Sequence, residues 1–203
     1  VVFLFYFNKV QQKKEIQLYS KDKENFQKLK SNLNFQTDWF IHNIPYWIAV
    51  FKKLKIDRQR PLKLLEIGSF QGMSTIFLAN YFKNATITCV DSWLDSYVKE
   101  FLPDANKISN LEKSFDNNTK LFGERINKFK GSSYDFYAKN SEKFYDLIYV
   151  DGSHYCDDVI IDAFKAFEIL IPGGLMIFDD YVWDNKNNPL NEWPIGAINS
   201  FLR

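Results

Sequence analysis

The segment "LKLLEIGSFQGMSTIFLANYFKNATITCVD" (residues 62–91) contains the pattern that the rest of the chain repeats. Its first part, 62–68, is a short apolar run that ends in glycine, as a buried parallel strand would. Residues 73–82 then show helical spacing, and 85–91 form a second strand-like run. A strand, a helix and a strand in this order are typical of a parallel sheet with crossover helices. The segment therefore predicts an α/β protein.

The same alternation continues to the end of the chain. Further strands are predicted at 126–131, 145–151 and 174–180, and helices at about 105–123 and 158–170. Ahead of the first strand, residues 8–34 form a loose polar helix. Residues 37–54 form an aromatic-rich helix that Pro45 interrupts, because proline lacks the amide hydrogen of a helix interior. We predict a Rossmann-like, doubly wound, mainly parallel sheet with helices on both faces.

Composition and charge restrict the class of protein. The 203 residues, 46% hydrophobic and 25% charged, suit one globular domain. A net charge of +1 gives no general reason to expect nucleic acid or an anionic membrane as partner. Cys89 and Cys156 lie far apart without a CxxC spacing, which favours a reduced, cytoplasmic setting. The sequence also allows a homo-oligomer.

The two ends of the chain suggest how it is divided. Residues 1–60 hold twelve basic against five acidic residues, whereas 61–203 hold fourteen against twenty. We predict an N-terminal extension over 1–34 and one domain over 35–203. The chain lacks an initiating methionine and stops at "SFLR" within a helical pattern. We therefore expect a fragment whose domain is truncated at its C-terminus.

Acidic residues stand at most of the predicted strand ends. In open α/β sheets, ligands bind beyond the carboxyl ends of the strands. The residues predicted there are Glu66, Asp91, Ser132, Asp151, Asp179 and Asp180. Carboxylates that converge on one edge repel one another unless a cation lies among them, and oxygen ligands suit Mg²⁺ or a similar ion. Asp151, Asp179 and Asp180 are the predicted metal ligands.

The turn after the first strand predicts a ligand of a particular charge. Gly68 and Gly72 allow the backbone to approach a ligand closely, and the following helix start offers amide donors. Their G-x-x-x-G spacing differs from the dinucleotide fingerprint, and Glu66 would repel phosphate but suit a cationic or amino-bearing ligand. Asp91 is placed to accept ribose hydroxyls. Trp93 either stacks on a purine or packs in the core, and both interpretations remain open.

The turn "YVDGSHYCDD" (149–158) has two interpretations. Ser153 would cap the next helix, with Asp157 and Asp158 near its positive end. Alternatively, His154 removes a proton from a hydroxyl group that a cation at Asp151 holds, since imidazole has a pKa near neutrality. The cap does not explain the other acidic strand ends, so we favour the catalytic interpretation.

Five motifs in order carry a family resemblance. They are "LEIGSFQGMST", "ITCVDSW", "KGSS", "YDLIYVDGSHY" and "LIPGGLMIFDDYVW". Together they resemble the class I S-adenosylmethionine-dependent methyltransferases, and most of all the small-molecule O-methyltransferases related to catechol and macrolide-sugar enzymes. The resemblance runs from about residue 35 to 203 and includes a cap segment, "DWF…NIPYW".

The resemblance implies roles for individual residues. The residues that match its cofactor positions are Glu66, Gly68, Ser69, Phe70, Gly72, Ser74, Asp91, Ser92, Trp93, Ser132 and Asp151. Asp151, Asp179 and Asp180 match the metal positions, although catechol-type enzymes usually have Asn at the third. His154 stands where those enzymes have a catalytic Lys, and Asp-Gly-Ser-His is closer to the macrolide-sugar enzymes, in which the His is the base. The catalytic residues implied are thus His154 and Asp151.

The function expected from this resemblance is S-adenosylmethionine-dependent, Mg²⁺-assisted O-methyl transfer to a small hydroxylated acceptor, with sugars among the candidates. An alternative is a non-catalytic module with a methyltransferase fold that binds the cofactor or a partner. A third, an NAD-type oxidoreductase, is disfavoured by the missing third glycine. The resemblance also implies a final antiparallel strand pair, which we expect to be absent from this chain.

Overall fold

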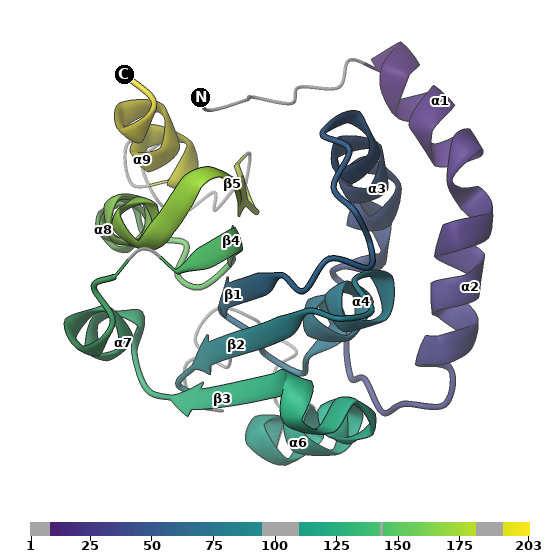
Figure 1. Cartoon of the computed structure of the whole chain (residues 1–203), viewed down its shortest axis with the longest axis horizontal. Helices are drawn as coiled ribbons and strands as arrows, with labels where there is room; N and C mark the ends of the chain where they lie inside the picture. The colour runs from purple at the N-terminus through teal and green to yellow at the C-terminus, as the bar shows by residue number, and fades with distance from the viewer. Residues whose placement is uncertain (1–8, 95–109, 143, 182–192) are drawn as a thin grey trace.

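The computed structural model describes residues 9–94, 110–142, 144–181 and 193–203. Five strands form one sheet in the order β3-β2-β1-β4-β5, and every strand pair is parallel (Figure 1). The strands are β1 (Lys63–Ile67), β2 (Thr86–Asp91), β3 (Ile126–Lys130), β4 (Tyr145–Val150) and β5 (Leu170–Phe178). This arrangement confirms the predicted Rossmann-like fold.

Helices cover both faces of the sheet (Figure 1). The crossover helices are α4 (Met73–Tyr81), α6 (Leu111–Thr119), α7 (Ser133–Lys139) and α8 (Cys156–Ile169). Side chains of a strand alternate between faces, so Leu64 packs with the α4 side and Leu65 with the α7 and α8 side. Both leucines are fully buried, which is why β1 is a continuous apolar run apart from Glu66.

The N-terminal helices join the α4 side of the core. They are α1 (Lys9–Leu18), α2 (Ser20–Lys30), the short 3₁₀ helix η1 (Ile41–Asn43) and α3 (Ile44–Lys53). Phe26 of α2 packs edge-on against Phe40 and Phe77, with ring centroids 6.4 and 5.6 Å away. The division at residues 34 and 35 stays a prediction.

Two local predictions were wrong at proline and glycine positions. Pro45 lies in the first turn of α3, where no amide hydrogen is needed, so it begins the helix instead of interrupting it. The strand predicted at 174–180 starts earlier, at Leu170, so the "PGG" sequence at 172–174 lies within β5. The register of β5 with β4 shifts near Tyr145.

Other parts of the chain add helices to the predicted pattern. The helix predicted at 105–123 is described only from residue 110, as α6 followed by the 3₁₀ turn η3 (Lys120–Arg125). Helix α7 was not predicted, and α9 (Pro194–Phe201) accounts for the helical pattern near the end of the chain. Within the described ranges, no helix has both the length and the apolar character needed to cross a membrane.

Candidate active site

The turn after β1 lies directly against the turn after β4. Gly68 has φ +85°, and a Cβ atom added there would lie 1.9 Å from the carbonyl oxygen of Asp151. The Asp151 amide in turn donates to the carbonyl of Ile67 at 2.8 Å, and the Gly68 amide donates to Val90 at 2.9 Å. Glycine is thus needed at 68 for contact between two loops, a reason that the sequence did not reveal.

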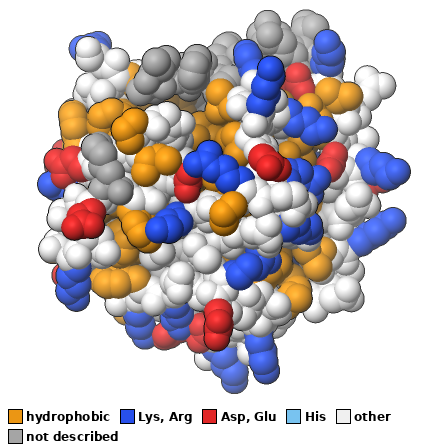
Figure 2. Space-filling view, in the orientation of Figure 1, with side chains coloured by type: hydrophobic (Ala, Val, Ile, Leu, Met, Phe, Trp, Pro, Cys, Tyr) orange, Lys and Arg blue, Asp and Glu red, His pale blue; other side chains and the backbone are white. Residues whose placement is uncertain are grey.

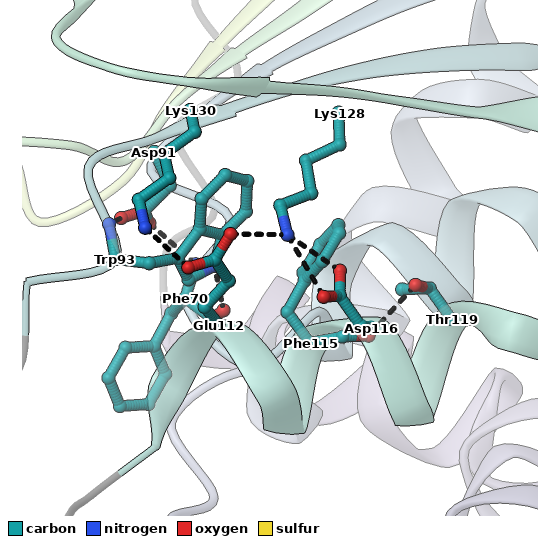
Figure 3. Close-up of polar contacts among 9 residues, drawn as sticks. All are labelled: Phe70, Asp91, Trp93, Glu112, Phe115, Asp116, Thr119, Lys128 and Lys130. Carbon is teal, nitrogen blue, oxygen red and sulfur yellow. Dashed lines mark hydrogen bonds and ion pairs between the residues drawn. The ribbon is translucent and has the colours of Figure 1, made fainter.

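Asp91 joins the turns after β1 and β2 (Figure 3). Its Oδ2 accepts the Phe70 amide at 2.8 Å and its Oδ1 accepts the Trp93 amide at 2.6 Å. Phe70 and Trp93 both have φ +47°, a left-handed backbone that these bonds help to hold. Burial raises the pKa of Asp91, and the amides of Trp93 and Phe70 oppose that rise.

The Trp93 ring packs in the core. Its indole nitrogen donates to the Phe70 carbonyl at 2.8 Å, and its ring lies 4.8 Å from that of Phe115 (Figure 3). The Lys128 ammonium group covers the ring at 4.9 Å and is held by Asp116. Only 5% of Trp93 is exposed, which fits the packing interpretation. Its predicted contact with a purine stays a prediction.

Buried polar atoms lie beneath the first turn. Glu66 is fully buried and accepts a hydrogen bond from the Thr75 hydroxyl. Its Oε1 and the Ser69 hydroxyl are buried without a hydrogen-bond partner among the described groups. Burial raises the pKa of Glu66, and the nearby hydroxyls of Ser74, Thr75 and Ser69 oppose that rise. Because unpaired buried polar atoms are costly, they mark a place where a ligand with donor groups fits.

The remaining predicted cofactor residues border these turns. Gly72 has φ +82° and precedes α4, and Ser74 lies buried in its first turn. Ser132 caps α7: its hydroxyl accepts the Asp135 amide at 3.1 Å and donates to the Asp135 carboxylate at 2.7 Å. Ser132 therefore has a structural role at the end of β3.

Three side chains converge beyond β4 and β5. One possible ligand atom from each of Asp151, His154 and Asp180 lies within 4.8 Å of the others. His154 Nε2 is 2.6 Å from Asp180 Oδ2. Burial and the charges of Asp179 and Asp180 raise the pKa of Asp151 well above its usual value. Two carboxylates and one imidazole, all half-buried, are a donor set that suits a divalent cation.

Asp179 has partners outside this group. Its Oδ2 accepts the Asn43 side-chain amide at 2.9 Å and the Tyr149 hydroxyl, and its Oδ1 accepts the Asp180 amide at 2.9 Å. The Tyr149 hydroxyl also lies 2.8 Å from Asp151 Oδ2. The structure thus gathers His154, in place of Asp179, with the other two predicted metal ligands. Sequence reasoning missed Asn43 and Tyr149, although Tyr149 faces the same side of β4 as Asp151.

The turn ahead of α8 is stabilised by Ser153. Its hydroxyl donates to Asp158 at 2.7 Å and accepts the Tyr155 amide at 3.2 Å. The N-cap residue of α8 is Tyr155, so the predicted cap at Ser153 is displaced by two positions. A structural Ser153 and a functional His154 are therefore compatible within one turn.

Asp162 of α8 lies buried behind this turn. Its side chain is 2% exposed, and its Oδ1 has no partner among the described residues. Burial, as the main cause, raises its pKa from 3.8 to about 7, while the Ser133 hydroxyl opposes the rise. Between pH 4 and 7 the unfolded chain ionises at this position but the native protein does not, so native stability falls as the pH rises through that range.

Asp162→Asn is expected to remove this pH dependence. The wild type should lose stability relative to the variant as the pH rises. The free energy of unfolding of the variant minus that of the wild type should therefore be roughly 2–3 kcal/mol larger at pH 8 than at pH 5, given about 1.4 kcal/mol for each pKa unit. Urea unfolding of both proteins at the two pH values measures it. A gain that is the same at both values would contradict the raised pKa of Asp162.

Comparison with known proteins identifies the family of this sequence. Residues 65–181 match a family model described as a methyltransferase domain. No curated protein matches the sequence.

Solved structures share the fold at low sequence identity. An O-methyltransferase from Bacillus cereus, in complex with SAH, is 16% identical with a TM-score of 0.58; the match covers 96% of this chain and 78% of that one. A SAM-dependent methyltransferase from Agrobacterium tumefaciens is 18% identical with a TM-score of 0.51 and is matched over 68% and 44% of the two chains. The chain therefore spans less than half of that second protein.

Proposed function

This chain belongs to the methyltransferase domain family of S-adenosylmethionine-dependent enzymes, and from that premise we propose that it methylates an oxygen atom of a small hydroxylated acceptor with the help of a divalent cation. Sugars are among the candidate acceptors. The observation that carries this proposal is the His154–Asp180 pair beside Asp151, because it combines a base with cation ligands. The free thiols of Cys89 and Cys156 support a cytoplasmic location.

The turns after β1 and β2 supply the groups that would hold S-adenosylmethionine. Asp91 would accept ribose hydroxyls, and Glu66 Oε1 with the Ser69 hydroxyl would accept hydrogen bonds from the amino group. When bound, this cofactor supplies a methyl group on a positively charged sulfur atom. An acidic site suits this positive charge, and the cofactor has no phosphate group for Glu66 to repel. Its amino group would supply donors for the unpaired oxygen atoms of Glu66 and Ser69.

Asp91→Ala is expected to weaken binding of S-adenosylhomocysteine by about 1.5–3 kcal/mol, the worth of hydrogen bonds to a charged group. Calorimetry measures the affinity, and circular dichroism checks the fold, because Asp91 also holds two turn amides. Asp116→Ala removes an equal charge from the neighbouring helix α6 and should leave the affinity unchanged. Wild-type affinity in a folded Asp91→Ala protein would show that Asp91 does not bind the ribose.

On the acceptor side, His154 would take the proton of the acceptor hydroxyl at Nδ1, because its Nε2 faces Asp180 Oδ2. Asp180, 2.6 Å away, would then stabilise the imidazolium ion and fix the orientation of the ring. Asp151 and Asp180 offer oxygen ligands to a divalent cation, which when bound supplies positive charge that favours an ionised acceptor oxygen. The Tyr149 hydroxyl contacts both Asp151 and Asp179, and so orients the Asp151 carboxylate.

Asp180→Asn is expected to weaken Mn²⁺ or Mg²⁺ binding by at least about tenfold, with activity partly restored by excess metal, because one ligand is weakened. Asp179→Asn should have a smaller effect, since Asp179 acts through Tyr149 and Asn43. Titration calorimetry of the metal alone measures both, with Glu168→Gln at the exposed far end of α8 as control. Unchanged metal affinity in Asp180→Asn would rule out a cation at this residue.

A screen of hydroxylated acceptors with labelled S-adenosylmethionine and Mg²⁺ tests the proposed function. Label should appear on an acceptor oxygen. Tight binding of S-adenosylhomocysteine without transfer to any acceptor would instead favour the non-catalytic module. Against that alternative stands the group of Asp151, His154 and Asp180, since clustered carboxylates are costly in a protein that has no use for them.

A further inference from the structure

The loops at the carboxyl ends of all five strands contain no lysine or arginine in their described residues. These segments are 68–72, 92–94, 131–132, 151–155 and 179–181. The segment 34–43, whose Asn43 reaches Asp179 across this edge, also contains none. The chain as a whole has 26 basic residues, and Figure 2 shows many of them spread over one face of the molecule. The lack of basic residues is therefore local to the site.

The described basic residues just before the end of β3 and just before segment 34–43 are paired with acids. Lys128 and Lys130 of β3 form ion pairs with Glu112, and Lys128 also with Asp116 (Figure 3). Lys30 is paired with Asp38 at 2.7 Å. By sequence alone, residues 95–109 and 182–192, which follow β2 and β5, hold three basic against five acidic residues. None of these segments brings an excess of positive charge.

The carboxylates at the carboxyl ends of β4 and β5 and at the start of α8 carry more negative charge than one divalent cation would balance. A cation held by Asp151 and Asp180 would balance those two carboxylates and leave Asp179. Asp157 and Asp158 add two further charges in the first turn of α8. The hydrogen bonds that Asp158 accepts come from the neutral hydroxyls of Tyr134 and Ser153, so its charge is not balanced there. These two acids would repel an anionic group at this helix start.

We propose that the acceptor is uncharged or positively charged, and that hydroxyl compounds carrying phosphate or carboxylate groups, coenzyme A esters included, are rejected. This rests on the proposed function. Phosphate and carboxylate groups are bound mainly by arginine, lysine and helix N-termini. The described edge has no arginine or lysine, the start of α4 borders the proposed cofactor site, and the start of α8 carries Asp157 and Asp158. Like charges brought together at a binding site select strongly against the wrong partner.

A matched series of catechols tests the charge preference. Dopamine, 4-methylcatechol and 3,4-dihydroxybenzoate share the reacting ring and are a cation, a neutral molecule and an anion. Neutral methyl glucoside and anionic methyl glucuronide form a second pair. At low salt, kcat/KM for each anion is expected to be lower than for its neutral partner by on the order of tenfold or more. The gap should narrow at high salt because exposed charges are screened. Equal or better use of the anions would overturn the proposal.

Charge reversal locates the effect. Asp157→Lys is expected to narrow the gap between anionic and neutral acceptors several-fold, because exposed Asp157 lies next to the site without binding a reactant. Glu168→Lys makes the same change at the far end of α8 and should leave the gap as it is. If the difference in kcat/KM between anionic and neutral acceptors is the same in both variants as in the wild type, the preference does not come from the charge of Asp157.

Equilibrium binding separates failure of this inference from failure of the proposed function. Calorimetry of the same compounds on protein loaded with S-adenosylhomocysteine needs no turnover. If no compound is methylated but the neutral and cationic members bind at least tenfold more tightly than the anions, the charge preference is confirmed and the proposed methyl transfer is contradicted. If the anions bind as well as the others, or if no neutral or cationic member binds, the charge preference is wrong.

Discussion

His154→Ala is expected to lower turnover by about 10²–10⁴-fold, the usual worth of a positioned general base. The variant should bind S-adenosylhomocysteine and divalent metal as the wild type does, because Asp91, Asp151 and Asp180 remain. Raising the pH should recover part of the loss, since the acceptor hydroxyl then ionises without help. Steady-state kinetics across pH, with calorimetry of both ligands, measures these effects.

The second histidine supplies the control for this substitution. His42 lies exposed in η1, and His42→Ala should keep turnover close to that of the wild type. Wild-type turnover in His154→Ala would reduce the turn at 151–155 to a structural element. Loss of metal affinity together with turnover would show instead that His154 is a cation ligand, as its place in the group with Asp151 and Asp180 permits.

Gly68→Ala is expected to destabilise the protein by at least about 4 kcal/mol, or to prevent folding. The new Cβ atom would lie 1.9 Å from the Asp151 carbonyl oxygen, 2.5 Å from its carbon and 2.7 Å from the Gly152 Cα. All three are backbone atoms, so no side-chain rotation relieves the clash. The loops after β1 and β4 would have to separate, so the turn at 68–72 would move away from Asp151.

Gly173→Ala is a matched control, because Gly173 has φ +82° and a Cβ atom there meets nothing within 4 Å. It should cost only the left-handed backbone penalty of about 1–2 kcal/mol. Urea unfolding compares the two variants, and soluble yield reports a Gly68→Ala protein that does not fold. Equal losses at the two positions would show that the contact between the loops contributes nothing.

Local patterns in the chain predict most of the fold. The apolar runs at 62–68 and 145–151 and the helical spacing at 73–82 are signals within a few residues of one another, so they need no knowledge of distant contacts. Because the strands are parallel, their last residues meet at one edge, which made Glu66, Asp91 and Asp151 predictable as neighbours. The helix after Ser132 was missed, although a serine followed three residues later by an acid is a helix-start signal.

The partners within the site depend on packing between distant segments. Asn43 and Asp179 are 136 positions apart and meet because α3 packs on the sheet, where Trp47 contacts the ring of Tyr149 at 4.6 Å. That packing directs Asp179 toward Asn43 and Tyr149, leaving His154 beside Asp180. Periodicity places a residue on a face or at a strand end, but side-chain partners follow from the volume and donors of neighbours that only tertiary packing brings into contact.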